Sequence, residues 1–283
     1  MRAVKFSLGF DLRSLALMRI AVAGLYLLDL LGNLPHLEAF YCDTGLMPRA
    51  SLVSSPRPLH WSLYMSYGTI NMVGMIYALH LAVVVALMLG YRTRLTSLIG
   101  FFMAASLQSR VEVLPGWDGE IRLLLLYGAF LPWGERFTLW PRPKAQDFCL
   151  SAATIAWRIQ LLTLYLGAGL LKGGAYWADG TAVDVSLHSD AYATVWASRL
   201  LQVLKPYPEA LVWLNDGVPL VELLVPCLLF VPIPWVQFAG ALALGLMHLG
   251  FGLCLDIDLF SPVCCACLLC FVPADVWNRL AQR

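Results

Sequence analysis

The feature that most constrains this chain is a series of apolar runs, each close to the length that a helix needs to cross a bilayer. A transmembrane helix takes about 20 residues, and its backbone groups must pair within the helix because lipid offers no hydrogen bonds. We therefore predict an all-α fold, a polytopic bundle of about eight transmembrane helices. The third and fourth runs are the shortest. The runs lie at 15–34, 69–89, 95–109, 117–133, 151–171, 213–232, 234–254 and 257–273.

The composition agrees with an integral membrane protein. Hydrophobic residues make up 60% of the chain and charged residues 13%, whereas soluble proteins average about 45–50% and about 25%. The longest polar stretches, 35–68 and 172–212, are too short for a soluble domain with its own core, so residues 1–283 are predicted to form one membrane domain. A formal net charge of +1 offers no basic surface for nucleic acid, and the expected partner is the lipid bilayer.

Basic residues between the runs predict the orientation, because they collect on one side if eight helices cross. The positive-inside rule makes that side cytoplasmic. We predict a multi-pass protein of the inner (plasma) membrane with both termini in the cytoplasm. The first run is similar to a signal peptide, but Arg19 and Asp29 interrupt it, and we expect it to stay attached. The basic residues are Arg2, Lys5, Arg13, Arg92, Arg94, Arg136, Arg142, Lys144, Arg279 and Arg283.

The stretch 172–213 differs from the rest because aromatic and polar residues alternate in it. This mixture is typical of the membrane interface. We predict short amphipathic helices at 180–188 and 191–204 that lie on the membrane as a lid over the bundle. The aromatic residues are Trp177, Tyr192, Trp196, Tyr207 and Trp213.

Most of the eight cysteines fall in or beside apolar runs. Cysteine in such a run acts as a small hydrophobic residue. We therefore expect neither disulfides nor a metal site.

Ionisable residues recur inside the apolar runs. Inserting each of them into the membrane costs about 2.5–3.5 kcal/mol of free energy, so each is expected to have either a bonding partner or a functional role. Arg158, Tyr165 and Lys172 are seven residues apart and fall on one face of a helix, as do Gln237 and His248 on another. We predict a bundle that encloses a polar cavity of hydrated or quinone size. The alternative is that Arg158 reaches out to water and Arg19 pairs with Asp29 or Glu222, so that these groups only fix helix packing.

Lys172 follows the apolar run LLTLYLGAGLL and precedes two glycines. Desolvation at such a boundary lowers the pKa of a lysine, which then serves as a general base. An interfacial lysine that reaches for water is the other interpretation of the same pattern. His248 is either a catalyst or a helix-to-helix hydrogen-bond donor, and Asp118 opens a run, where an acid also favours a helix N-terminus.

Four blocks in order resemble one known family. The third block is the most specific, with a lysine after a small-residue helix end and then a tryptophan, an acid and a glycine. The chain as a whole resembles the membrane domain shared by vitamin K-dependent gamma-carboxylases and the bacterial HTTM (horizontally transferred transmembrane domain) proteins. The matching residues are Arg19, Asp29, Tyr41, Asp43 and Gly45 in the first block, Asp118 in the second, Lys172, Trp177, Asp179 and Gly180 in the third, and His248 in the fourth.

The resemblance implies chemistry on a lipid-soluble hydroquinone. In the carboxylases the matching lysine deprotonates vitamin K hydroquinone, and dioxygen and carbon dioxide take part in the steps that follow, without a metal. Lys172 would be the base here, His248 would hold carbon dioxide or an oxyanion, and Asp179 would orient the lysine or the lid. The large lumenal region of the carboxylases has no counterpart in this sequence, so the resemblance implies oxidation of vitamin K hydroquinone or another quinol more than protein carboxylation.

Three hypotheses of function remain open. The first is a membrane-embedded enzyme that acts on a quinol, coupled or not to modification of a peptide. The second is a non-catalytic membrane partner for the maturation or export of a peptide, which docks on the aromatic interfacial stretch. The third is a small-solute or lipid transporter, against which the lack of inverted repeats counts.

Overall fold

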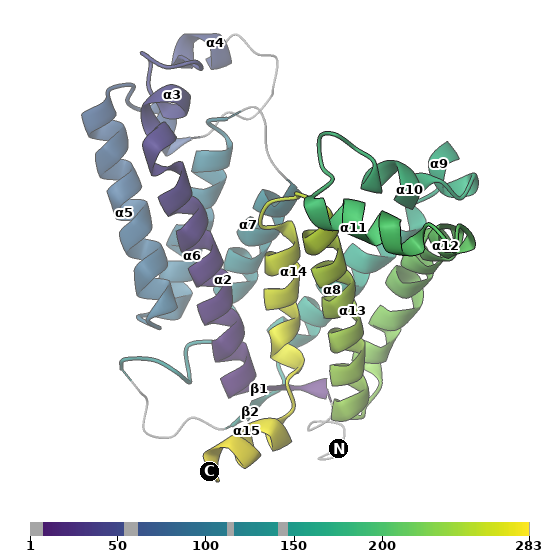
Figure 1. Ribbon diagram of the computed structural model, residues 1–283. Coiled ribbons are helices and arrows are strands. Elements are labelled where there is room, and N and C mark those ends of the chain that lie inside the picture. Colours follow the sequence, from purple (N-terminus) through teal and green to yellow (C-terminus); the bar gives the residue numbers. More distant parts are fainter. Residues whose placement is uncertain (1–7, 54–61, 112–115, 141–146, 283) are drawn as a thin grey trace. The chain divides into compact units, whose positions relative to one another are not determined.

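The computed structural model describes residues 8–53, 62–111, 116–140 and 147–282, except for the side chains of residues 53, 116 and 117 (Figure 1). Helices make up most of this part and strands almost none of it, so the all-α prediction is confirmed. The two described strands, β1 (Phe10–Asp11) and β2 (Phe148–Cys149), are two residues each and pair antiparallel. The chain forms two compact units, Leu15–Ala145 and a second unit that joins Met1–Ser14 to Gln146–Arg283.

In the Leu15–Ala145 unit, α6 packs between α5 and α7, and α3 rests on α5. Two residues with positive φ, Gly90 (82°) and Arg92 (41°), form the tight turn between α5 and α6. The elements are α2 (Leu12–Asn33), η1 (Leu34–His36), α3 (Leu37–Tyr41), α4 (Arg49–Val53), η2 (Leu63–Met65), α5 (Ile70–Met88), α6 (Thr93–Gln108) and α7 (Gly116–Gly128).

In the second unit, α12 packs on α8, and α13 lies beside α14 (Figure 1). Helix α8 begins at a capping box in which the Ser151 and Thr154 side chains bond each other's backbone amide. The helical elements are α8 (Ala152–Leu170), α9 (Ala175–Ala178), α10 (Ala182–Leu187), α11 (Val195–Leu204), α12 (Glu209–Leu224), η3 (Val225–Phe230), α13 (Pro234–Cys254), α14 (Phe260–Leu268), η4 (Leu269–Phe271) and α15 (Ala274–Ala281). The short helices predicted at 180–188 and 191–204 are therefore present as α10 and α11.

Each of the eight predicted runs contains a helix, but the helices differ in their fitness to cross a bilayer. Among the described residues, four are long and apolar enough, and the segments Phe260–Phe271 and Ala274–Ala281, bent by 81°, make a fifth if they count as one span. Helices α6 and α7 have 16 and 13 residues, fewer than the roughly 20 that a span needs. The chain is a helical membrane bundle with four or five candidate spans. The four are Leu12–Tyr41, Ile70–Met88, Glu209–Phe230 and Pro234–Cys254.

Helix α13 shows how the polarity of a soluble helix is inverted here. Its outward stripe consists of leucines at helical spacing, each more than half exposed, whereas Gln237 and His248 are buried. An apolar exterior around a polar interior suits a lipid environment and would be costly in water. The leucines are Leu242, Leu246, Leu249 and Leu253.

Candidate functional site

Lys172 lies just beyond the end of α8 and is paired with a buried acid. Its Nζ atom is 2.5 Å from Oε2 of Glu222 on α12 and donates a second hydrogen bond, 3.3 Å long, to the carbonyl of Ala168. The two side chains are 19% and 6% exposed. Glu222 was expected only as a possible partner of Arg19, because nothing in the local sequence marks a partner 50 residues from Lys172.

Gly169 makes this pairing sterically feasible. A Cβ at Gly169 would lie 2.8 Å from the Leu223 side chain and 3.3 Å from the backbone oxygen of Pro219. The first distance is shorter than Cβ contacts in proteins and the second is tight, so the glycine lets α8 approach α12 closely. The small residues at the end of α8, which the sequence analysis assigned to a motif, thus have a role in packing: they let the helix that precedes Lys172 lie close to α12.

Tyr165 and His248 form a second buried pair. The tyrosine hydroxyl is 3.0 Å from Nε2 of the histidine, and both side chains are at most 3% exposed. The other ring nitrogen of His248, Nδ1, has no hydrogen-bond partner among the described residues. Lys172 lies close enough to His248 for an electrostatic interaction, and so does Glu222 to Tyr165, which brings the two pairs into one group. We call Tyr165, Lys172, Glu222 and His248 the polar cluster.

Of the other residues in the third sequence block, Trp177 contacts Lys172, whereas Asp179 is exposed. The ring of Trp177 on α9 lies 5.5 Å from Nζ of Lys172, a cation–π contact. Gly180 has a φ of 73°, a left-handed conformation that favours glycine. Asp179 is exposed at the end of α9, and the carboxylate that contacts the lysine is that of Glu222.

Arg158 is held inside the second unit and does not reach water. It is 1% exposed, and its guanidinium donates to the carbonyls of Leu229 and Gly9 and, at 3.2 Å, to Oε1 of Gln237. It also stacks 4.4 Å from the ring of Phe10. The alternative that Arg158 reaches out to water is therefore wrong. The shared faces are confirmed for Arg158 with Tyr165 and for Gln237 with His248, because α8 contacts α13 twice, through Arg158 with Gln237 and through Tyr165 with His248. Lys172 lies beyond the end of α8 and bonds Glu222 on α12 instead.

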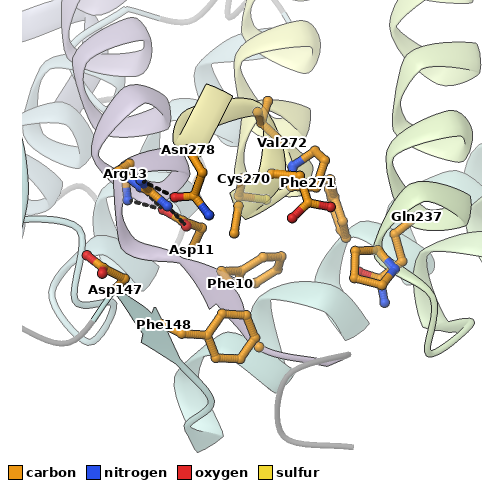
Figure 2. Close-up of a pocket in the computed structure, with 15 residues that line it drawn as sticks. Phe10, Asp11, Arg13, Asp147, Phe148, Gln237, Cys270, Phe271, Val272 and Asn278 are labelled. Carbon is orange, nitrogen blue, oxygen red and sulfur yellow. Dashed lines mark hydrogen bonds and ion pairs between the residues drawn. The ribbon is translucent and has the colours of Figure 1, made fainter. Parts of the chain in front are cut away.

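A cavity of about 280 Å³ lies beside the groups that hold Arg158. Figure 2 shows Phe10, Phe271 and Gln237 on its walls, together with Asp11, whose carboxylate binds Arg13 at 2.7 Å. No member of the polar cluster lines this cavity. The polar cavity expected around Arg158, Tyr165 and Lys172 stays a prediction, because none of these three residues lines this pocket.

Two predicted site residues, Arg19 and Asp118, belong to the Leu15–Ala145 unit. Arg19 is fully buried and donates to the carbonyls of Trp133 (2.7 Å), Phe137 (2.5 Å), Arg136 and Met88. The proposed pairing of Arg19 with Asp29 or Glu222 is therefore wrong, and the partner of Glu222 is Lys172. The backbone oxygen of Asp118 accepts a bond from the side chain of Gln108.

The structure also holds a histidine that sequence analysis missed. His80 on α5 is fully buried, with Nε2 2.9 Å from the Tyr26 hydroxyl and Nδ1 3.2 Å from that of Tyr64. The signal was present, since a histidine inside the apolar run 69–89 needs a partner as His248 does. Each unit thus contains a buried histidine that bonds tyrosine, namely His248 with one tyrosine and His80 with two.

The loop after the first span contains an ion pair that gives a pH-dependent prediction. Hydrogen bonds from Arg49 lower the pKa of Asp43 to about 2. Because the pKa is depressed in the folded chain, the pair stabilises fully above about pH 4 and loses its effect as pH falls toward 2. Thermal unfolding of wild type and Asp43→Asn should differ by a constant amount above pH 4 and converge below it. High salt should narrow the gap at neutral pH, because both side chains are about one-third exposed; a gap that persists unchanged at pH 2 would contradict the assignment.

All eight cysteines are free thiols. Within the described ranges, no group of three or more His, Cys, Asp or Glu side chains comes together as a metal site. No protein family model, curated protein or solved structure matches this chain.

Proposed function

We propose that this protein is a membrane-embedded enzyme in which Lys172 acts as a general base on a lipid-soluble hydroquinone. The observation that carries the proposal is the ion pair of partly buried Lys172 with buried Glu222 at a helix end, beside the Tyr165–His248 pair. Paired titratable groups enclosed by apolar helices are costly to bury, and function is the default reason to retain them.

The ion pair gives Lys172 a way to become a base. An ammonium cannot accept a proton, but Glu222 Oε2 is close enough to take one directly from Nζ. The transfer converts two buried charges into a neutral amine and a neutral carboxylic acid, and a low-dielectric site penalises the charged forms. The amine can then accept one proton from an acidic hydroxyl, which restores the ammonium.

The surroundings of Lys172 fit a lipid-soluble substrate. Leu170 and Leu171, just before it, are 71% and 86% exposed and would face acyl chains. The ring of Trp177 offers an aromatic wall. A hydroquinone, when bound, would supply the acidic hydroxyl and two electrons. His248 Nδ1, unpartnered among the described residues, is available to donate to an oxygen of a bound molecule, while Tyr165 holds Nε2.

The proposal extends to the family, the co-reactants and the membrane topology of the chain. We propose membership of the HTTM family, with vitamin K hydroquinone or another quinol, dioxygen and carbon dioxide as co-reactants. We also propose eight membrane crossings in the bacterial inner membrane, both termini in the cytoplasm, and the α10–α11 region as a lid at the interface. The basis of these statements is the order of sequence motifs and the distribution of basic residues.

The test is a quinol oxidation assay on the protein in lipid nanodiscs with reduced vitamin K, with the epoxide product followed by chromatography. Loss of a positioned base typically lowers a rate by about 10²–10⁴-fold, so Lys172→Ala should lose at least about 100-fold. Glu222→Gln should also be impaired, because the proton acceptor of the lysine is removed. Glu209→Gln, an exposed carboxylate on the same helix, is the matched control and should retain the wild-type rate.

Binding of a quinone analogue, followed by tryptophan fluorescence, gives a readout independent of turnover. Normal activity in both Lys172→Ala and Lys172→Arg would show that the lysine is not the base. Folded wild type that neither binds the analogue nor forms product would favour the non-catalytic peptide partner. That second function has its own observation, the exposed aromatic side chains Tyr192, Trp196, Tyr207 and Trp213, each at least half exposed.

A further inference from the structure

A second cavity, of about 440 Å³, lies in the Leu15–Ala145 unit where α5 turns into α6. One wall is the turn itself, with Tyr91, Arg92 and Arg94, and the other is the loop that carries Glu135 and Trp140. Gly90 also lines the cavity, and the candidate span Ile70–Met88 ends two residues before it. The cavity is therefore at a membrane boundary.

The charge of this cavity favours an anion. Arg92 and Arg94 are both exposed, and neither guanidinium makes a hydrogen bond or ion pair with any residue that the structure describes; that of Arg92 lies 5.7 Å from the ring of Tyr91. The lining contains one carboxylate, that of Glu135. Two guanidinium groups against one carboxylate leave an excess of positive charge. A planar guanidinium binds phosphate oxygens in pairs, which makes arginine the usual residue for phosphate recognition.

Aromatic side chains form the rim. Tyr91 and Trp140 are 42% and 57% exposed, and their rings pack edge to face with centroids 5.1 Å apart. Exposed tyrosine and tryptophan at a helix end are typical of the headgroup level, where an apolar ring and a polar edge are both accommodated. The rim therefore places the two arginines at the depth of lipid phosphates.

Buried Arg19 holds the two walls together. Its guanidinium joins the carbonyl of Met88, at the end of α5, to that of Trp133 in the opposite loop. A second tie is the bond from Thr138 Oγ1 to the Gly90 carbonyl, 3.2 Å long. Arg92 is kept at a φ of 41°, a conformation that costs energy for a residue with a side chain. Such strain persists where the surroundings enforce it, and it occurs often at binding sites.

We propose that this cavity binds the headgroup of an anionic phospholipid, with Arg92 and Arg94 on the phosphate and Tyr91 and Trp140 against the glycerol and upper acyl region. The loop lies on the side that the basic residues predict to be cytoplasmic, where anionic lipid provides the binding partner. The site is separate from the polar cluster and does not depend on the proposed enzymatic function.

The test is lipid titration of the full chain in detergent, followed by native mass spectrometry, with short-chain phosphatidylglycerol, phosphatidylcholine and inorganic phosphate as three probes. Wild type should retain phosphatidylglycerol at least tenfold more tightly than phosphatidylcholine. Each basic residue near a charged lipid contributes about 1 kcal/mol, so Arg92→Gln with Arg94→Gln should weaken retention roughly 30-fold. The lysine pair, Arg92→Lys with Arg94→Lys, should keep most of the preference, and Arg199→Gln, an exposed arginine in the other unit, should leave it unchanged.

Three outcomes would overturn the proposal: equal retention of both lipids by wild type, unchanged retention in the glutamine pair, or displacement of the lipid by inorganic phosphate at matched concentration. The comparison of lipids on wild type needs no variant, so it decides the matter even if the substituted chains fail to fold. Salt provides a further check, because retention should fall as ionic strength rises.

Discussion

Replacing Lys172 with methionine is expected to lower the free energy of unfolding by about 3–5 kcal/mol, because it leaves Glu222 as a buried carboxylate without its cation. Removing the acid as well should reverse most of that loss, since two apolar side chains of similar volume replace a buried ion pair at little cost. The double variant Lys172→Met with Glu222→Leu should therefore be more stable than Lys172→Met alone.

This comparison separates stability from activity. Lys205→Met removes an exposed lysine at the end of α11 and serves as the matched control, with an expected change within about 0.5 kcal/mol. Thermal unfolding in a fixed detergent gives all four values. If the double variant were as unstable as the single one, the two side chains would not be coupled, and the proton transfer proposed for Lys172 would lose its acceptor. If the double variant were stable but inactive, the pair would be needed for chemistry.

The second large effect is a contrast between two buried arginines of the same unit. Arg19→Met is expected to cost about 3–5 kcal/mol, because it leaves the carbonyls that Arg19 bonds, including those of Trp133 and Phe137, unsatisfied. Arg110 is equally buried, yet none of its three nitrogens has a partner among the described residues. Arg110→Met should therefore be neutral or stabilising, because the buried charge that it removes makes no hydrogen bond among the described residues and has only the through-space attraction of Asp43 to offset its desolvation.

Thermal unfolding of the two methionine variants, side by side, measures this contrast. Both substitutions remove one positive charge from a fully buried position, so they control for each other in charge and volume. An Arg110→Met chain as unstable as Arg19→Met would mean that Arg110 has a stabilising partner in the native protein. A stable Arg19→Met chain would mean that water satisfies the freed carbonyls. The turn after α5 and the 131–140 loop, which Arg19 joins, should then be held together less firmly around the cavity.

The periodic signals in the sequence predicted the elements well. All eight apolar runs contain helices, and the seven-residue spacing correctly placed Arg158 and Tyr165 on one buried face of α8. The same spacing misplaced Lys172, because the helix ends at Leu170 and the lysine turns back toward α12. Spacing describes a helix only as far as the helix continues, and the glycines after Lys172 mark its end.

The partners of buried charges were the part that the sequence could not predict. Arg19 and Arg158 bond mainly to backbone carbonyls, and every residue carries one, so no residue type marks the acceptor. Glu222 was visible as a charge, but its distance of 50 residues from Lys172 gave no register between α8 and α12. The contact depends on Gly169 and its neighbours, that is, on how two surfaces fit.

The order of synthesis gives the Lys172–Glu222 pair a further consequence. The ribosome makes about 5–20 residues per second, so the 50 residues between the two take roughly 3–10 s. During that interval α8 has been made, but Glu222 is not yet there to pair with its lysine. Until Glu222 is made, the ammonium of Lys172 can stay hydrated, because a long side chain at the end of a helix reaches the headgroups. Glu222, which is less exposed and has a shorter side chain, leaves the ribosome second, when its counterion has already been made.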